Sequence, residues 1–179
     1  WQIIPIETDP PVEIDADGYN VITFIKLVNR GSIEQKIFNL FENNQFLLFL
    51  KSENLKMSFW VDGESRSNIE KVKEGDKVIL LSNGKESSKW LLYINDKVEV
   101  PSELKDSINS DINTPDKLKY ANTFDLSFAI ALDNNNQLRR LTKEESFIYT
   151  YLPTSYRFGS EGFPFLVNAN FITDAGRQQ

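Results

Sequence analysis

The sequence predicts an α+β fold, with a helix packed on a mixed sheet early in the chain and antiparallel β-hairpins later. Three observations predict this class. An apolar stripe at helical spacing follows Ser32, short runs of branched and aromatic residues begin near Met57, and polar two-residue turns separate those runs. The change from helical to strand pattern near residues 52–70 indicates a soft boundary between the two parts.

The first helix is predicted to begin at Ser32 and to run to about Asn43. The Ser32 hydroxyl can accept a hydrogen bond from the backbone N–H three residues on, and Gln35 can reach back, which is a capping-box pattern. The apolar residues that share one helix face are Ile33, Ile37, Leu40 and Phe41. The run Phe46–Leu50 follows as a strand or a second buried helix, and periodicity does not decide between them.

The segment before this helix is predicted to be extended. Residues 1–18 are rich in proline, which blocks helix formation, and they end in a turn at Asp17-Gly18. Tyr19–Val28 is rich in β-branched and aromatic residues and is predicted to form a buried strand.

Short strands and turns are predicted from residue 56 to residue 100. The strands are Met57–Val61, Lys77–Leu81, Trp90–Ile94 and Val98–Val100. The turns between strands are expected at Asp62-Gly63, Asn83-Gly84 and Asn95-Asp96. This order predicts a strand followed by a meander of antiparallel hairpins.

The rest of the chain is predicted to be a short exposed helix followed by more strands. The helix covers Pro101–Asp111. In Thr123–Leu132 every second residue is large and apolar, which predicts a strand with that face buried. Residues 134–136 form a tight polar turn, and the further strands are Leu138–Thr142, Phe147–Leu152 and Phe163–Ile172.

Composition excludes several kinds of chemistry. The chain of 179 residues has no His and no Cys, so Ser–His and Cys–His nucleophile pairs, thiol redox chemistry and zinc sites built on imidazole or thiolate are excluded. No metal ligands are predicted. The lack of cysteine favours a reducing compartment, and we expect a cytoplasmic protein.

Charge and hydropathy narrow the partners. The net charge is −6, and the densest basic stretch, Arg139-Arg140 and Lys143, is followed at once by Glu144-Glu145, so no nucleic-acid partner is expected. The longest purely apolar run, Phe46–Leu50, is far too short to cross a membrane, and no membrane partner is expected. Because the chain begins at Trp1 and stops at Gln179 without a break in pattern, we expect a piece of a longer protein.

The segment Phe147–Gln179 contains three motifs: Tyr151-Leu152-Pro153-Thr154, the run from Phe163 to Phe171 (FPFLVNANF), and Arg177-Gln178-Gln179. Together they resemble the region just past the nucleotide-binding domain in sacsin-like members of the GHKL ATPase superfamily. Phe46–Lys51 with Leu55–Phe59, and Pro115–Ala121 before a strand, are similar to other stretches of that family. The family's Asn-bearing helix and its D-x-G-x-G box are not visible in this sequence.

The resemblance implies a division of the chain and a function. Residues 1–60 would be the C-terminal part of a GHKL-type ATPase domain, and residues 61–179 a β-rich continuation that leads into the transducer domain. The chain would then be a non-autonomous portion of an ATPase that couples ATP binding and hydrolysis to conformational change. Its partner would be the rest of its own polypeptide, a client protein being an additional partner.

The resemblance also implies site residues and cofactors. Arg177 matches the basic residue with which a transducer reaches the γ-phosphate, and a guanidinium suits that role because its donors are fixed and always charged. Asn168 and Asn170 would contact the nucleotide from one strand face. ATP and Mg²⁺ are expected in the parent protein, whereas this chain alone is expected to bind neither and to be inactive.

Two readings from other classes stay open. One is a stand-alone β-rich protein-interaction module without nucleotide chemistry, in which aromatic strands form a core and an exposed strand edge recruits a partner. The other is a hydrolase built on two carboxylates, which requires two acidic side chains to face each other across a cleft.

Overall fold

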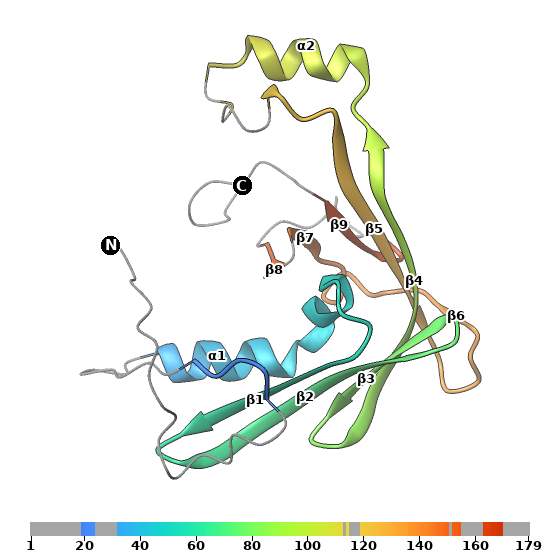
Figure 1. Cartoon of the computed structure of the whole chain (residues 1–179). Helices are drawn as coiled ribbons and strands as arrows, with labels where there is room; N and C mark the ends of the chain where they lie inside the picture. The colour runs from blue at the N-terminus through green and yellow to red at the C-terminus, as the bar shows by residue number, and fades with distance from the viewer. Residues whose placement is uncertain are drawn as a thin grey trace.

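The fold is mostly β, with one curled mixed sheet and few helices (Figure 1). The computed structural model describes residues 19–23, 32–112, 114, 119–150, 152–154 and 163–169. A helix on a mixed sheet is present as predicted, but the α+β expectation overstates the helix content. The reason lies in two stretches: the apolar run after the first helix forms only a short 3₁₀ segment, and a polar stretch without a strand signal joins the sheet.

Within the described residues, nine strands form the sheet in the order β1-β2-β3-β4-β5-β9-β7-β8, with β6 paired to β5 outside this path. Their bounds are β1 Leu55–Val61, β2 Glu64–Glu74, β3 Lys77–Ser82, β4 Lys85–Glu99, β5 Thr123–Leu132, β6 Leu138–Arg139, β7 Ile148–Thr150, β8 Leu152–Pro153 and β9 Leu166–Ala169. The pairs are antiparallel except β7 with β9, which is parallel. The sheet is therefore mixed late in the chain rather than early.

Helix α1 (Ile33–Glu42) begins after Ser32 and ends before Asn43, close to the predicted bounds. The predicted capping box is wrong, because the Ser32 side chain makes no cap hydrogen bond. Gln35 instead donates from Nε2 to Oδ1 of Asn39, 2.7 Å away on the next turn. The apolar stripe of α1 lies against the sheet, where the ring of Phe41 packs 5.7 Å from that of Phe59 on β1.

The apolar run after α1 forms a 3₁₀ helix, η1 (Asn44–Phe49), neither a strand nor a second α-helix. Phe46, Leu47, Leu48 and Phe49 are all 5% exposed or less, because the curled sheet wraps around them on one side. Asn44 fixes the start of η1: its Nδ2 donates to the carbonyl oxygen of Leu81 at 3.4 Å and to Oγ of Ser87 at 3.3 Å. The core is thus centred on η1.

Two hairpin turns are confirmed. Asp62-Gly63 and Asn83-Gly84 have positive φ at both residues, 51° and 80° in the first turn and 50° and 76° in the second. Two-residue hairpin loops need this backbone conformation, which Asn, Asp and Gly adopt readily. The turns join β1 to β2 and β3 to β4. The sequence did not predict β2, whose many charged residues hide an alternation of inward Ser67, Ile69 and Lys71.

The prediction of a turn at Asn95-Asp96 is wrong. β4 continues through these residues as one strand of 15 residues, and its pairing with β5 shifts between Asn95 and Val98. One extra residue is accommodated there as a β-bulge, so the polar dipeptide interrupts the register without reversing the chain. The helix predicted after this strand is confirmed as α2 (Ser102–Ser110).

The predicted strands near the C-terminus are confirmed within the described residues. β9 is inserted between β5 and β7, so the middle of the sheet is built from segments far apart in the sequence. The division at residues 60 and 61 stays a prediction; β1 runs across it. Residues 19–23 form no strand and Val21 is 80% exposed, so the buried strand predicted from Tyr19 is wrong for this part, while residues 24–28 lie outside the described residues.

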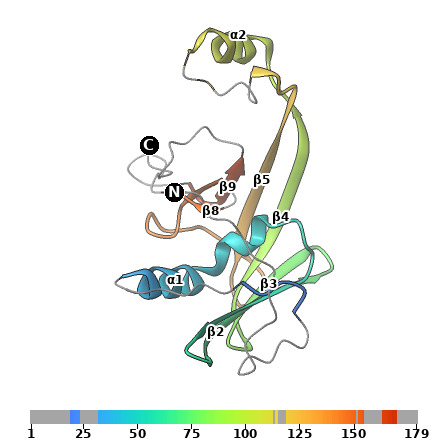
Figure 2. The ribbon, with the colours of Figure 1, turned by 60° about the vertical axis from the view of Figure 1, so that its left-hand side comes forward.

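The molecule has two unlike regions. In the body, α1 and η1 cover the inner face of the sheet (Figure 1). Beyond the bulge, β4 and β5 extend away from the body as two strands that lead to α2 (Figures 1 and 2). We call the described residues beyond the bulge, Val98–Ile112 and 119–124, the tip. The face of the sheet that carries α1 and η1 is the inner face, and its opposite is the outer face.

Candidate functional site

Two of the three residues predicted to contact nucleotide, Arg177 and Asn170, lie outside the described residues. The third, Asn168, lies on β9 between Ser127 of β5 and Tyr149 of β7, and is 1% exposed. A buried amide satisfies its hydrogen bonds inside the fold. A contact between Asn168 and a nucleotide stays a prediction.

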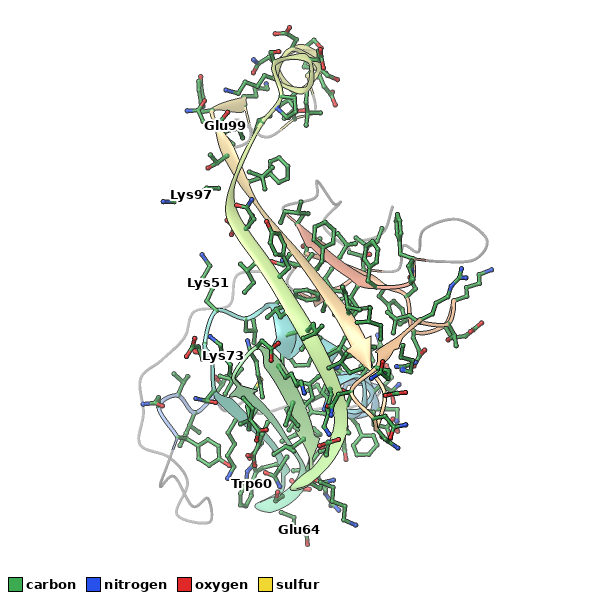
Figure 3. All side chains as sticks on the ribbon, turned by 90° about the vertical axis from the view of Figure 1, so that its right-hand side faces the viewer. Lys51, Trp60, Glu64, Lys73, Lys97 and Glu99 are labelled. Atoms are coloured by element: carbon green, nitrogen blue, oxygen red, sulfur yellow. The ribbon has the colours of Figure 1, made fainter. Side chains whose placement is uncertain are left out.

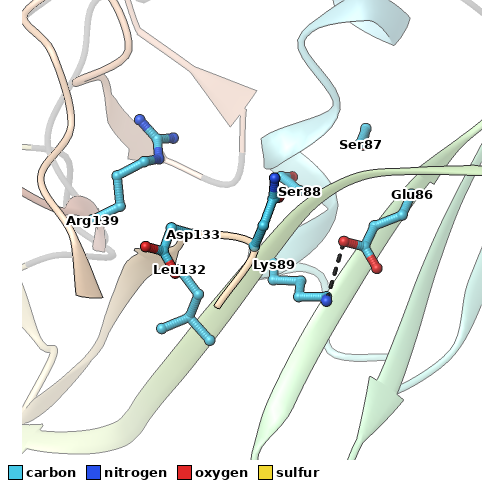
Figure 4. A pocket seen from close by; sticks show the side chains of 8 residues that line it. Glu86, Ser87, Ser88, Lys89, Leu132, Asp133 and Arg139 are labelled. Carbon is cyan, nitrogen blue, oxygen red and sulfur yellow. Dashed lines mark ion pairs between the residues drawn. The ribbon is translucent and has the colours of Figure 1, made fainter. Parts of the chain in front are cut away.

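A shallow pocket of about 330 Å³ lies where β4 begins and β5 ends (Figure 4). Its lining residues are Glu86, Ser87, Ser88, Lys89, Leu132, Asp133, Asn134 and Arg139. Four of these side chains carry formal charges, two of each sign, so the pocket has no net charge to attract an ion. Sequence reasoning did not single out this place.

The charged groups of the pocket are held by neighbouring groups of the chain itself. Lys89 forms an ion pair with Glu86 at 3.3 Å, drawn as a dashed line in Figure 4. Nη1 of Arg139 donates to Oε2 of Glu145 at 2.8 Å. The carboxylate of Asp133 accepts two backbone N–H groups of its own turn, each at 2.8 Å. These contacts build a turn and a loop.

The two serines of the pocket are also occupied. Oγ of Ser87 donates to the carbonyl oxygen of Leu80 at 3.0 Å, and Oγ of Ser88 accepts the indole N–H of Trp90 at 2.8 Å. Nucleophilic catalysis needs a hydroxyl within hydrogen-bond reach of a general base. Neither serine has such a partner among the described residues, so the pocket offers binding space without a nucleophile.

Lys71 is a buried cation that sequence reasoning missed. It lies on β2, is 3% exposed, and its Nζ donates to the carbonyl oxygens of Leu48 at 3.3 Å and Leu50 at 2.6 Å. These carbonyls lie at the end of η1, where a cation is favourable because helix carbonyls lack partners there. Burial lowers the pKa of Lys71 below its ordinary value, although nearby Glu53 opposes the shift. Lys71 therefore holds η1 on the sheet.

Tyr149 is the other strongly perturbed group. It is 1% exposed on β7, its ring lies 4.9 Å from that of Phe49, and burial raises the pKa of its phenol well above the ordinary value. A phenol that stays neutral inside the core contributes packing rather than acid–base chemistry. Within the described part of the chain, no three acidic side chains gather where they could hold a metal ion.

The outer face of β4 and β5 carries the most unusual surface. The residues of β5 that face the core are small, namely Ser127, Ala129 and Ala131, each 5% exposed or less. The prediction that the large alternate residues of β5 are buried in the core is therefore wrong. The reason is steric: Trp90 and the residues of η1 fill the space beneath β5, so only small side chains fit there.

The large side chains of β5 lie on the outer face, where they meet those of β4. Tyr93 is opposite Phe128, and Leu91 is opposite Ile130. The rings of Tyr93 and Phe128 stack with centroids 6.3 Å apart, and Phe165 meets Phe128 edge-on at 5.6 Å. We call Leu91, Tyr93, Phe128 and Ile130 the outer ridge.

The outer ridge is not covered by any described helix or strand. Figure 3, which views the molecule from this side, shows β4 and β5 in front of all other described elements. Tyr93 is 58% exposed, and the other three residues are half-buried. An antiparallel sheet with one face in water normally carries polar residues there. An apolar stripe on that face instead marks a surface that meets another layer.

None of the described helices is long and apolar enough to cross a membrane. The comparisons with known proteins add no assignment: no protein-family model matches the chain, and neither a curated protein nor a solved structure matches it. The site is therefore argued from its own geometry.

Proposed function

We propose that this chain is a protein-interaction module and that the outer ridge is the surface its partner covers. The observation that supports this most is the inversion of β5, with alanines toward the core and Phe128 and Ile130 toward the outside. Fully burying one large apolar side chain contributes about 1.5–3 kcal/mol. A partner that covers the half-buried ridge gains part of that for each of four residues.

The chemistry of the ridge indicates the kind of partner. Aromatic and branched side chains offer apolar contact, and the Tyr93 hydroxyl supplies a polar group at the rim, a combination typical of contact centres between proteins. Lys89, next to the lower end of the ridge, is already paired with Glu86, so covering it leaves no isolated charge. We infer a polypeptide partner with an apolar face, in the cytoplasm.

Site-specific photo-crosslinking tests this proposal. A photo-reactive phenylalanine analogue replaces Tyr93 in one variant and Ile94 in a matched control, since the two residues are neighbours on β4, are 58% and 55% exposed, and face opposite sides. We expect a defined crosslinked polypeptide from position 93, none from position 94, and loss of the product when Ile130→Glu is added. Equal crosslinking at both positions, or none at 93, would refute the proposal.

We also propose, from the sequence resemblance, that the chain belongs to a sacsin-like GHKL ATPase and couples ATP binding to conformational change. The support is the segment Phe147–Gln179. On this proposal the partner on the outer ridge is the rest of the same polypeptide, and ATP with Mg²⁺ binds outside this chain. The position of Arg177 suits a contact with the γ-phosphate.

Calorimetry and kinetics test the ATPase proposal. The chain alone should not bind ATP, because one arginine provides too little of a nucleotide site. In the full-length protein, Arg177→Ala should lower ATP turnover on the order of 10²–10³-fold with a smaller effect on ATP affinity. Arg177→Lys should restore turnover only in part, since ammonium lacks the planar fork. Unchanged turnover in both variants would remove Arg177 from the site.

A further inference from the structure

The support for β4 and β5 thins out along their length. β3 pairs with β4 only as far as Leu91, and β9 pairs with β5 only as far as Leu126. Beyond these points the two strands have each other alone, in the pairs Val98–Phe124 and Glu99–Thr123. A two-stranded ribbon without a third strand or a covering layer is only marginally stable.

The β-bulge lies at the point where this support ends. Two residues of β4, Asp96 and Lys97, are opposite the single residue Asp125 of β5. The side chain of Asn95 accepts the backbone N–H of Lys97 at 3.1 Å, which replaces a bond of the regular ladder. A bulge bends its strand and weakens the pairing locally.

Little else connects the tip to the body. No residue of α2 is buried, and the amine of Lys105 donates to Asn122, which belongs to the tip itself, at 2.9 Å. At the base of the tip, Lys51 lies 3.9 Å from Asp125, but its side chain is 79% exposed. An exposed ion pair contributes about 0–1 kcal/mol. Figures 1 and 2 show α2 standing apart from the other helices in both views.

The tip is long enough for a small bend to matter. Three extended residues from Val98 to Val100 span about 10 Å, and half of α2 adds about 7 Å. A bend of about 20° at the bulge then moves the middle of α2 by roughly 5 Å, since the lever is about 15 Å long. Motions of this kind occur in the microsecond-to-millisecond range.

We propose that the tip moves as a unit relative to the body, with the bulge between Asn95 and Val98 as its pivot. The ladder on the body side is held by neighbouring strands, and the tip has its own internal bonds, such as that from the backbone N–H of Val100 to the carbonyl oxygen of Asn122 at 3.0 Å. Two units that are each bonded internally and joined at a bulge form a hinge. This device does not depend on what covers the outer ridge.

Distance measurements between spin labels test the hinge, and the chain suits them because it has no cysteine. One pair of labels connects Ser107→Cys on α2 with Lys36→Cys on α1. A control pair connects Lys36→Cys with Lys85→Cys, both in the body. We expect a distance distribution about twice as wide for the tip–body pair as for the control pair.

Deleting Asp96 identifies the pivot, since it restores one-to-one pairing of β4 with β5. The tip–body distribution should then narrow toward the control width, while the control pair, unchanged, shows that the body still folds. A tip–body distribution as narrow as the control in the original chain would overturn the hinge. A wide distribution that the deletion leaves wide would overturn the bulge as its pivot.

Discussion

The body and the tip are built from the same two strands, yet different interactions hold them. In the body, β4 and β5 have neighbouring strands on both edges and the η1 core beneath, and Trp90 is 1% exposed. In the tip, the strands have only each other, and Leu104 of α2 is 46% exposed. Strand length alone therefore does not give stability; layers and neighbouring strands do.

The difference also separates the two faces of β4. Trp90 and Leu92 face the core, whereas Leu91 and Tyr93 face outward, so one unbroken apolar run serves both faces. A strand with apolar residues on both sides is typical of a sheet covered on both sides. Here the structure supplies one of those layers, and the proposed partner supplies the other.

The largest expected effect contrasts two residues of β4. Trp90→Ala should lower the free energy of unfolding by about 3–5 kcal/mol, since it opens a cavity in the core and removes the partner of Ser88. Tyr93→Ala should lower it by about 1 kcal/mol or less, because its side chain is mostly exposed. Urea unfolding of both variants checks the contrast, and similar losses in both would contradict the assignment of faces.

The buried Lys71 gives the next effect. Lys71→Met should lower the free energy of unfolding by about 1–3 kcal/mol, because the carbonyl oxygens of Leu48 and Leu50 lose their donor inside the core. Equal stability of the variant and the original chain would show that η1 does not depend on this cation.

The pH dependence of Lys71 provides a second measurement. Its pKa in the folded state is lowered by burial, so between that pKa and the ordinary value of 10.5 the unfolded chain binds more protons. Stability should therefore rise with pH in this window for the original chain relative to Lys71→Met. Taking the difference between the two proteins cancels Tyr149, whose raised pKa lowers stability at alkaline pH in both. A difference that does not change with pH would contradict the shift.

A smaller effect is expected at the loop before β7. Glu145 accepts hydrogen bonds from Arg139 at 2.8 Å and from the backbone N–H of Thr142 at 2.9 Å. The hydrogen bond from Arg139 is the main cause that lowers the pKa of Glu145, so the contribution is present above the ordinary value of 4.5 and is lost as pH falls through the lowered pKa. Glu145→Gln should cost about 0.5–1 kcal/mol at pH 7, discounted for solvent exposure. The same cost at pH 2 would exclude this cause.

The smallest effect concerns the tip. Leu104→Ser should change the free energy of unfolding of the body by about 0.5 kcal/mol or less, because α2 buries no residue. Hydrogen exchange followed residue by residue checks this, with protection of β2 and β3 as the reference. A large loss of protection in the body would show that the tip and the body fold as one unit.

Sequence reasoning identified the elements with strong local signals. The apolar stripe of α1, the Asp62-Gly63 and Asn83-Gly84 turns, and α2 follow from spacing and turn chemistry alone. It missed β2, whose inward residues include a lysine, and it assigned β5 to the wrong orientation. Alternation shows that a strand has two unlike faces, but only the volume left beside Trp90 and η1 decides which face is inside.

The site was less predictable than the fold. The outer ridge depends on strand pairing between residues 91–93 and 128–130, which no local pattern reveals. The bulge looked like a turn because Asn-Asp favours both, and the difference lies in whether the flanking residues continue to pair with β5. Of the residues singled out by resemblance, Asn168 lies in the sheet and Arg177 and Asn170 lie outside the described residues.

The most direct test of the central claim combines unfolding and crosslinking in a single variant, Ile130→Glu. If the outer ridge serves a partner rather than the chain's own core, the free energy of unfolding should fall by only about 1 kcal/mol, while crosslinking from position 93 disappears. A loss of about 3 kcal/mol or more would place Ile130 in the core, and crosslinking that survives the charge would show that the partner binds elsewhere. Either result would contradict the account.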